Sequence, residues 1–166
     1  MKEKHYLERT DPLFTVKLRK SRAAVRKVAK HIGEQEGVEP YLPPEFTRKD
    51  VYHRKEGNDG GDFWIGNSRR EVKHKFKVWF DSVDKYPWWR VFLDETFRVD
   101  AYAPKPDFFY IVAKDLSGML KVDVALTRFA WDSAEVTEKE WYGGELCCKD
   151  MIVYRVPKIL CVYEAL

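Results

Sequence analysis

The clearest pattern of hydrophobic and polar positions in this chain lies between residues 62 and 80. Asp62 opens an aromatic and β-branched run that Gly66 and Asn67 can end as a two-residue hairpin loop. From residue 69 to residue 80 charged and apolar side chains then alternate, which is typical of a strand with one face in the core. The pattern therefore predicts a β-hairpin.

The register of this hairpin follows from counting outward from its loop. The expected pairs are Ile65 with Ser68, Trp64 with Arg69, Phe63 with Arg70 and Asp62 with Glu71. Directly opposed residues share a face, with Cβ atoms about 5 Å apart. Lys73 points to the same face as Glu71 because side chains repeat every second residue on a strand. The sequence thus predicts a cluster of Asp62, Glu71 and Lys73.

The chemistry of this cluster favours phosphodiester hydrolysis. Two carboxylates held this close with no competing partner repel one another, and hard oxygen ligands suit Mg2+ or Mn2+. Lys73 could orient an attacking water or stabilise the negative charge that builds on a phosphate in the transition state. The alternative is a solvated strand face on which Glu71 pairs with Arg69 or Lys73 and carries no chemistry.

At these residues the sequence resembles the PD-(D/E)XK nuclease superfamily, in which an acidic residue on one strand precedes a Glu-X-Lys triplet on its neighbour. Asp62, Glu71 and Lys73 match those three positions, although Gly61 stands in place of the proline. Glu71-Val-Lys73 is the only acidic-X-Lys triplet among 27 acidic residues. The resemblance implies a restriction-endonuclease-like core in which both carboxylates and the backbone carbonyl of Val72 bind Mg2+.

Further residues are candidates for supporting roles. In several branches of the superfamily a glutamate of the first helix assists the metal, which makes Glu34 and Glu36 accessory candidates. Lys75 lies one strand repeat beyond Lys73 and could contact a phosphate. The superfamily also places a helix after the motif strand, but residues 81–87 offer only a turn or two before a proline.

Two groups of basic residues favour a nucleic-acid partner, although the net charge is only +3. The first lies between residues 17 and 30, where apolar residues recur at helical spacing from Ser21, a possible N-cap, to Ile32, before a stop at Gly33. The second lies on the strand over residues 69–77. The expected contacts are Lys20, Arg22, Arg26 and Lys30 from the helix, and Arg69, Lys75 and Lys77 from the strand.

The rest of the chain completes an α+β fold. Strands are expected over residues 46–53, 88–93, 107–114 and 120–129, and strand-like residues broken by Pro157 over 151–163. The acidic segment 131–142 is expected to be a helix. We predict a single domain over residues 1–166 with a central mixed β-sheet flanked by helices, its core at about 21–128 and a C-terminal extension at 129–166.

Composition places the protein among ordinary folded domains, since 45% of its residues are hydrophobic and 15% aromatic. No apolar run approaches the roughly 20 residues of a membrane span, and residues 1–4 lack the apolar segment of a signal peptide. A cytoplasmic location without membrane contact is expected. Cys147, Cys148 and Cys161 lack a zinc-like spacing and are expected to be reduced thiols.

The aromatic cluster of Tyr86, Trp88 and Trp89 leaves two interpretations open. The rings could stack with splayed bases, but packing in the core is favoured because large aromatic residues usually pack there.

The sequence favours a Mg2+-dependent endonuclease acting on DNA, with RNA as a second substrate class. A homodimer is attractive on symmetry grounds because paired cuts across a duplex need two sites. The main alternative is a non-catalytic nucleic-acid-binding or assembly protein that uses the basic helix 17–30 and the strand 69–77. A structural protein with neither activity nor nucleic acid is the third interpretation.

Overall fold

The computed structural model describes residues 12–44, 61–142 and 145–166. In chain order its elements are α1 (Pro12–Glu36), β1 (Phe63–Ile65), β2 (Ser68–His74), β3 (Arg90–Glu95), α2 (Thr96–Ala101), β4 (Phe108–Val112), β5 (Gly118–Asp123), α3 (Val124–Thr127), β6 (Asp132–Tyr142), β7 (Glu145–Pro157) and β8 (Val162–Ala165). Short 3-10 turns, Arg128–Ala130 and Lys158–Leu160, precede β6 and β8. The strand expected over 46–53 lies outside the described residues.

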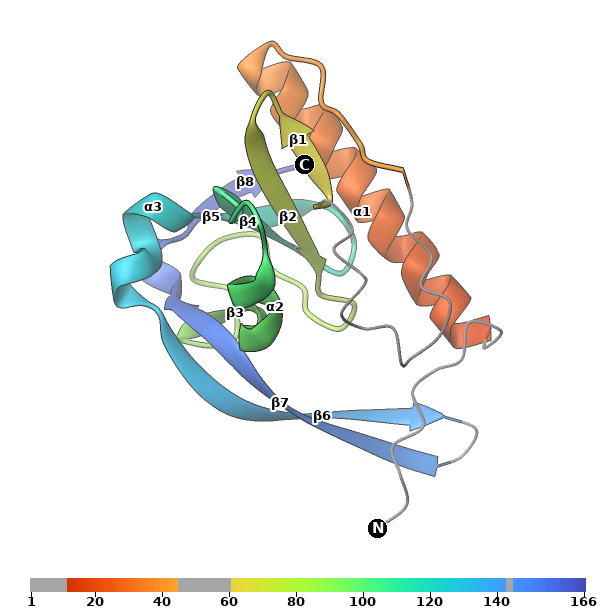
Figure 1. The fold of residues 1–166 in the computed structure, drawn as a ribbon. Helices are drawn as coiled ribbons and strands as arrows, with labels where there is room; N and C mark the ends of the chain where they lie inside the picture. Colours follow the sequence, from red (N-terminus) through yellow and green to blue (C-terminus); the bar gives the residue numbers. More distant parts are fainter. Residues whose placement is uncertain (1–11, 45–60, 143–144) are drawn as a thin grey trace.

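The strands form two sheets. A five-stranded mixed sheet has the order β1-β2-β4-β5-β8, and a three-stranded sheet has the order β3-β7-β6. Strands β2 and β4 are parallel, whereas the other neighbours in both sheets are antiparallel. Figure 1 shows α1 lying across the five-stranded sheet and the long β6–β7 hairpin extending away from it. The predicted α+β fold around a mixed sheet is confirmed.

Helix α1 covers one face of the five-stranded sheet. Its residues Ala24, Val28 and Ile32 are fully buried and pack in one cluster with Val72 of β2 and Tyr110 of β4. The spacing of four residues places them on one side of the helix. The predicted amphipathic helix is therefore confirmed over this stretch.

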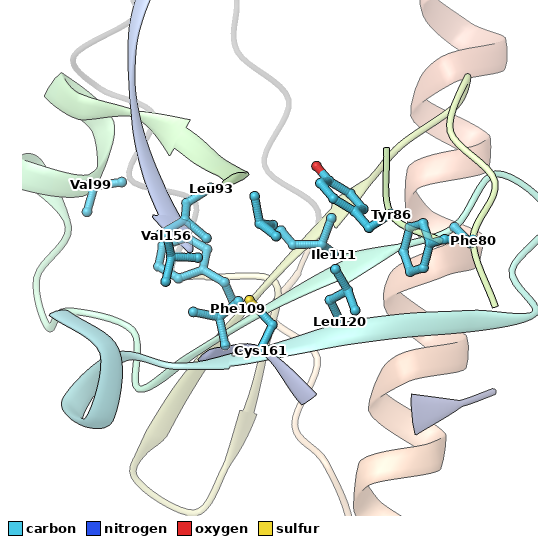
Figure 2. Packing of buried hydrophobic residues seen from close by; sticks show 12 residues of the cluster. Phe80, Tyr86, Leu93, Val99, Phe109, Ile111, Leu120, Val156 and Cys161 are labelled. Atoms are coloured by element: carbon cyan, nitrogen blue, oxygen red, sulfur yellow. The ribbon is translucent and has the colours of Figure 1, made fainter. Parts of the chain in front are cut away.

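The opposite face of the sheet packs against the second sheet instead of the expected flanking helices. Figure 2 shows Phe109 and Ile111 of β4 and Leu120 of β5 meeting Leu93 of β3 and Val156 of β7. Because side chains alternate along β2, its residues on either side of the buried Val72 point to this second face. Glu71 and Lys73 therefore lie on the face of the sheet opposite α1. Near this core, Cys161 is a buried free thiol, and Cys148 is also free.

Helix α1 is longer than predicted at both ends. It begins at Pro12, a residue well suited to the first helical turn, so Ser21 lies inside the helix and is not its N-cap. At the other end Gly37 has φ +68°, and the Val38 N–H donates to the Gly33 carbonyl at 3.0 Å. This Schellman-type end places the stop one turn beyond Gly33. Neither α1 nor any other helix in the described ranges is long and apolar enough to cross a membrane.

The helix predicted over residues 131–142 is wrong, because this segment is the strand β6. Ala134 and Val136 are partly buried while Ser133 and Glu135 are exposed, which is a period of two. The strand pairs with β7 along its whole length. Its acidic composition concealed this alternation.

The strand predicted over residues 120–129 is too long at its C-terminal end. Strand β5 ends at Asp123, whose carboxylate accepts a 3.0 Å hydrogen bond from the Leu126 N–H. This is an N-cap contact, and the short helix α3 follows it.

The connection between the parallel strands β2 and β4 spans residues 75–107. It holds β3 and then the six-residue helix α2, so the helix that the superfamily places between these strands is short here and follows an additional strand. The C-terminal part also belongs to the main structure, since β7 pairs with β3 and β8 pairs with β5. Residues 145–166 are thus part of both sheets, and the prediction that they form an extension outside the core is wrong.

Candidate functional site

The β1–β2 hairpin has the predicted register. Phe63 pairs with Arg70, Trp64 with Arg69 and Ile65 with Ser68. Gly66 has φ +56° at the first loop position, a backbone conformation that glycine readily adopts in two-residue hairpin loops. Just beyond the paired residues, the Val72 N–H donates a 2.6 Å hydrogen bond to Oδ2 of Asp62. This contact fixes the Asp62 carboxylate beside Glu71, as the register predicts.

Glu71 is a buried carboxylate, with only 2% of its surface exposed. Arg69 donates from Nε to Glu71 Oε1 at 2.8 Å, and its Nη2 lies 2.7 Å from the same oxygen. The Lys73 Nζ lies 3.6 Å from Glu71 Oε2. The assumption that the carboxylates lack a competing partner is therefore wrong. The pairing of Glu71 with Arg69 and Lys73, which the alternative gives, is confirmed, but the face is not solvated because the side chains of Arg69 and Glu71 are buried.

Arg69 is part of the interior. Its side chain has no exposed surface, and its guanidinium lies 4.2 Å from the ring centroid of Tyr102. Tyr102 follows α2 in the long connection between β2 and β4, which covers this end of the strand. The prediction that Arg69 contacts nucleic acid is wrong, because the guanidinium serves Glu71 and the Tyr102 ring.

The structure adds Asp94 of β3 to the cluster. Its Oδ2 lies 2.6 Å from the Lys73 Nζ and accepts a 2.8 Å hydrogen bond from the Tyr102 hydroxyl. Lys73 thus lies between two carboxylates, those of Glu71 and Asp94. The only sequence signal for Asp94 was its place on the less buried side of the alternating strand 90–95. That signal gave no indication of its partner.

The charges in the cluster perturb one another strongly. Burial raises the pKa of Glu71 to about 7, with Asp62 adding to this effect, although Lys73 and Arg69 oppose it. Burial tends to raise the pKa of Asp94, but the nearby Lys73 outweighs it and lowers the pKa to about 2. Burial tends to lower the pKa of Lys73, but Asp94 and its other acidic neighbours raise it well above the ordinary value. At neutral pH Lys73 and Asp94 are charged, and Glu71 is the carboxylate that titrates.

This raised pKa predicts an unusual pH dependence of stability in metal-free protein. Between about pH 4.5 and pH 7 the folded state holds a proton on Glu71 that the unfolded state has lost. The free energy of unfolding should therefore fall as the pH rises through this window, by roughly 2 to 3 kcal/mol. Urea denaturation in EDTA from pH 4.5 to 7.5 measures it, with Glu71→Gln as the matched control. A wild-type profile parallel to that of Glu71→Gln would contradict the prediction.

The two accessory glutamates do not reach this cluster. Glu36 pairs with Arg70 at 3.2 Å, and Arg70 points to the face of β2 that α1 covers. Glu34 is exposed and lies 3.8 Å from Lys30, one helical turn away. Helix α1 packs on the face opposite Glu71, so neither residue is placed to assist a metal there.

The predicted nucleic-acid contacts separate into two groups. Lys20, Arg22, Arg26 and Lys30 lie on α1, and therefore on the helix that covers the face opposite the cluster. Lys75 and Lys77 follow β2, and Lys77 is exposed. The Lys75 Nζ lies 5.9 Å from the ring centroid of Phe92 on β3. Apart from the buried Arg69, Lys75 is therefore the predicted contact nearest to the cluster in the chain, and its approach to Phe92 places it on the β3 side of the sheet.

The oxygen donors of the cluster fit a hard divalent cation. Glu71 Oε1 is held by Arg69, so Oε2, whose contact among the described residues is the long one with Lys73, is the oxygen suited to a metal. Asp62 and the backbone carbonyl of Val72 supply the other candidate ligands, and Mg2+ prefers such oxygens. In the described ranges no group of three or more His, Cys, Asp or Glu side chains could hold a metal ion. A metal would therefore be held by two side chains and one carbonyl.

Comparisons with protein-family models, curated proteins and solved structures gave no match to this chain. Its function is therefore inferred from the geometry of the cluster.

Proposed function

We propose that this protein is a metal-dependent nuclease that hydrolyses phosphodiester bonds of DNA, built on a restriction-endonuclease-like core. The observation that carries the proposal is the hairpin register. It brings Asp62 to the Val72 N–H, beside Glu71, with the Lys73 ammonium 3.6 Å from the Glu71 carboxylate. These are the residue types that metal-assisted hydrolysis of a phosphodiester requires.

The charge balance of the cluster supports cation binding. Asp62, Glu71 and Asp94 carry three negative charges when ionised, against two positive charges on Arg69 and Lys73. Like charges held close in a buried site favour uptake of a cation or a proton. Asp62, Glu71 and the Val72 carbonyl would hold the metal.

The roles of the residues follow from their contacts. When bound, Mg2+ or Mn2+ supplies Lewis-acid stabilisation of the charge that develops on the phosphate. Lys73 keeps its proton because neighbouring acidic groups raise its pKa well above the ordinary value. It therefore orients water or neutralises a phosphate oxygen and does not act as the base. Asp94 fixes the direction of the Lys73 ammonium at 2.6 Å.

Metal-dependent cleavage and metal-induced stabilisation test the proposal together. Supercoiled plasmid and labelled DNA should be cut with Mg2+ or Mn2+ and left intact in EDTA. Mg2+ at a hundred times its Kd should also raise the free energy of unfolding by about 2.7 kcal/mol. Asp62→Asn should lose this stabilisation, whereas Asp81→Asn, a change at an exposed aspartate, should keep it. If wild type shows no cutting and no Mg2+ stabilisation, the proposal is contradicted.

One observation favours the non-catalytic alternative. Arg69, which is fully buried, and Lys73, which is partly exposed, already give Glu71 two basic partners, so the fold needs no metal to satisfy this carboxylate. A nucleic-acid-binding or assembly protein would show retention on DNA that weakens with salt but neither cutting nor Mg2+ stabilisation. The intracellular location, the activity on RNA and the homodimer are further parts of the proposal. The cleavage assay repeated with RNA tests the activity on RNA, and sedimentation tests the homodimer.

A further inference from the structure

Exposed aromatic rings lie beside the candidate site. Trp88 stacks on Phe92 with ring centroids 5.8 Å apart and planes inclined by 29°. Of the three aromatic residues expected in the core, only Tyr86 is buried, with 1% of its surface exposed. Trp88 and Trp89 are 45% and 86% exposed, so the core interpretation is wrong for both. Lys158 lies next to the Trp89 ring, and Lys75 lies next to Phe92, on which Trp88 stacks.

Two segments connect the stacked pair of Trp88 and Phe92 with the cluster: the residues that follow β2, and the strand β3. Lys75 follows Lys73 by one repeat of extended chain, about 7 Å, and its N–H donates to the Val112 carbonyl at 2.9 Å, which prolongs the pairing of β2 with β4. On β3, Phe92 lies two residues before Asp94, and the pairing of β3 with β7 shifts register between Phe92 and Glu95. Lys73 contacts Asp94, and the Lys75 Nζ lies 5.9 Å from the Phe92 ring. The two pairs are successive steps along one surface.

We propose that Trp88, Phe92 and Lys75 form a stacking platform for an unpaired base next to the scissile phosphate, so that the substrate is single-stranded or frayed DNA. Exposed rings bind bases by stacking, and an adjacent lysine binds the backbone phosphate. In a duplex the bases already stack on one another and offer no free face. The link to cleavage rests on the proposed nuclease function, whereas the base-binding surface does not.

The Trp89 ring is likewise exposed beside a lysine. It is 86% exposed, and the Lys158 Nζ lies 5.7 Å from its ring centroid. The Lys158 N–H donates to the Trp89 carbonyl at 2.9 Å, so the loop and the turn before β8 hold one another. A second base along the strand would meet an aromatic ring and a lysine here as well.

Binding in EDTA tests the platform without requiring cleavage. The probes are a fluorescent oligothymidine and an abasic oligonucleotide of the same length. Trp88→Ala should weaken oligothymidine binding about tenfold or more and leave abasic binding unchanged. Phe129→Ala removes a ring that is 83% exposed before β6 and is the matched control. Equal binding of oligothymidine by wild type and Trp88→Ala, or abasic binding as tight as oligothymidine binding, would overturn the platform.

Lys75→Gln is a second variant that leaves the rings in place. It should weaken the binding of both oligonucleotides equally and reduce the salt slope of binding by about 0.7, the value for one phosphate contact on a single strand. No change in either quantity would remove Lys75 from the platform and overturn the proposal in its present form.

Cleavage in Mg2+ separates the two proposals. Wild type should cut single-stranded or frayed DNA faster than duplex, and Trp88→Ala should lose this preference. If base-dependent binding is lost in Trp88→Ala but wild type cuts no DNA, the platform holds and the nuclease proposal fails. If duplex is cut as fast as single strands and Trp88→Ala behaves as wild type, the nuclease holds and the platform fails.

Discussion

Replacing Lys73 with alanine is expected to slow Mg2+-dependent DNA cleavage by about 100- to 1,000-fold, which is the usual cost of removing one group that stabilises transition-state charge. The ammonium is charged at neutral pH and held by Asp94 at 2.6 Å and by Glu71 at 3.6 Å. Single-turnover cleavage at saturating DNA measures the chemical step, and binding measured in EDTA should be nearly unchanged.

Controls separate this catalytic effect from a loss of folding. Lys139→Ala removes an exposed lysine of β6 and should cleave as wild type does. Lys73→Ala leaves Asp94 buried without its closest cation, which is expected to destabilise the protein. The double variant Lys73→Ala/Asp94→Ala removes that uncompensated charge and should regain stability without regaining cleavage. Wild-type cleavage by folded Lys73→Ala would exclude Lys73 from the chemistry.

The hairpin could be predicted because its signals are local. Gly66 and Asn67 define a two-residue loop, and strand alternation then fixes every partner outward to Asp62 and Glu71. The two ends of helix α1 were harder to predict from the sequence. Ser21 has the chemistry of an N-cap but lies within a helix whose length is set by Pro12 and the Gly37 end.

The surroundings of the cluster could not be predicted, because they depend on contacts distant in sequence. The alternation of β2 shows that Arg69 shares a face with Glu71, so Arg69 could be proposed as a partner from the sequence. Its burial comes from Tyr102, and the fixed position of Lys73 comes from Asp94. Both residues arrive through the 75–107 connection. The same connection converts an exposed strand face into a buried charged cluster.

Replacing Arg69 with methionine is expected to lower the free energy of unfolding by about 3 to 5 kcal/mol, which is the usual effect of removing one partner of a buried ion pair. Two of its nitrogens lie within 2.8 Å of Glu71 Oε1, and its guanidinium lies 4.2 Å from the Tyr102 ring centroid. Without them Glu71 keeps only the longer contact with Lys73. Urea denaturation in EDTA at pH 7.5 measures the change, and Arg19→Met, at an exposed position of α1, should cost less than about 0.5 kcal/mol.

The double variant Arg69→Met/Glu71→Gln identifies the cause of this loss. If a stranded carboxylate is responsible, neutralising it should make the double variant more stable than the sum of the two single changes implies. Arg69→Lys should recover only part of the stability, because an ammonium lacks the planar fork that reaches Glu71 and stacks on Tyr102. A loss below about 1 kcal/mol in Arg69→Met would instead be typical of an exposed pair. In that case Arg69 would hold Glu71 only weakly, and the carboxylate would be available to a metal, as the sequence alone predicts.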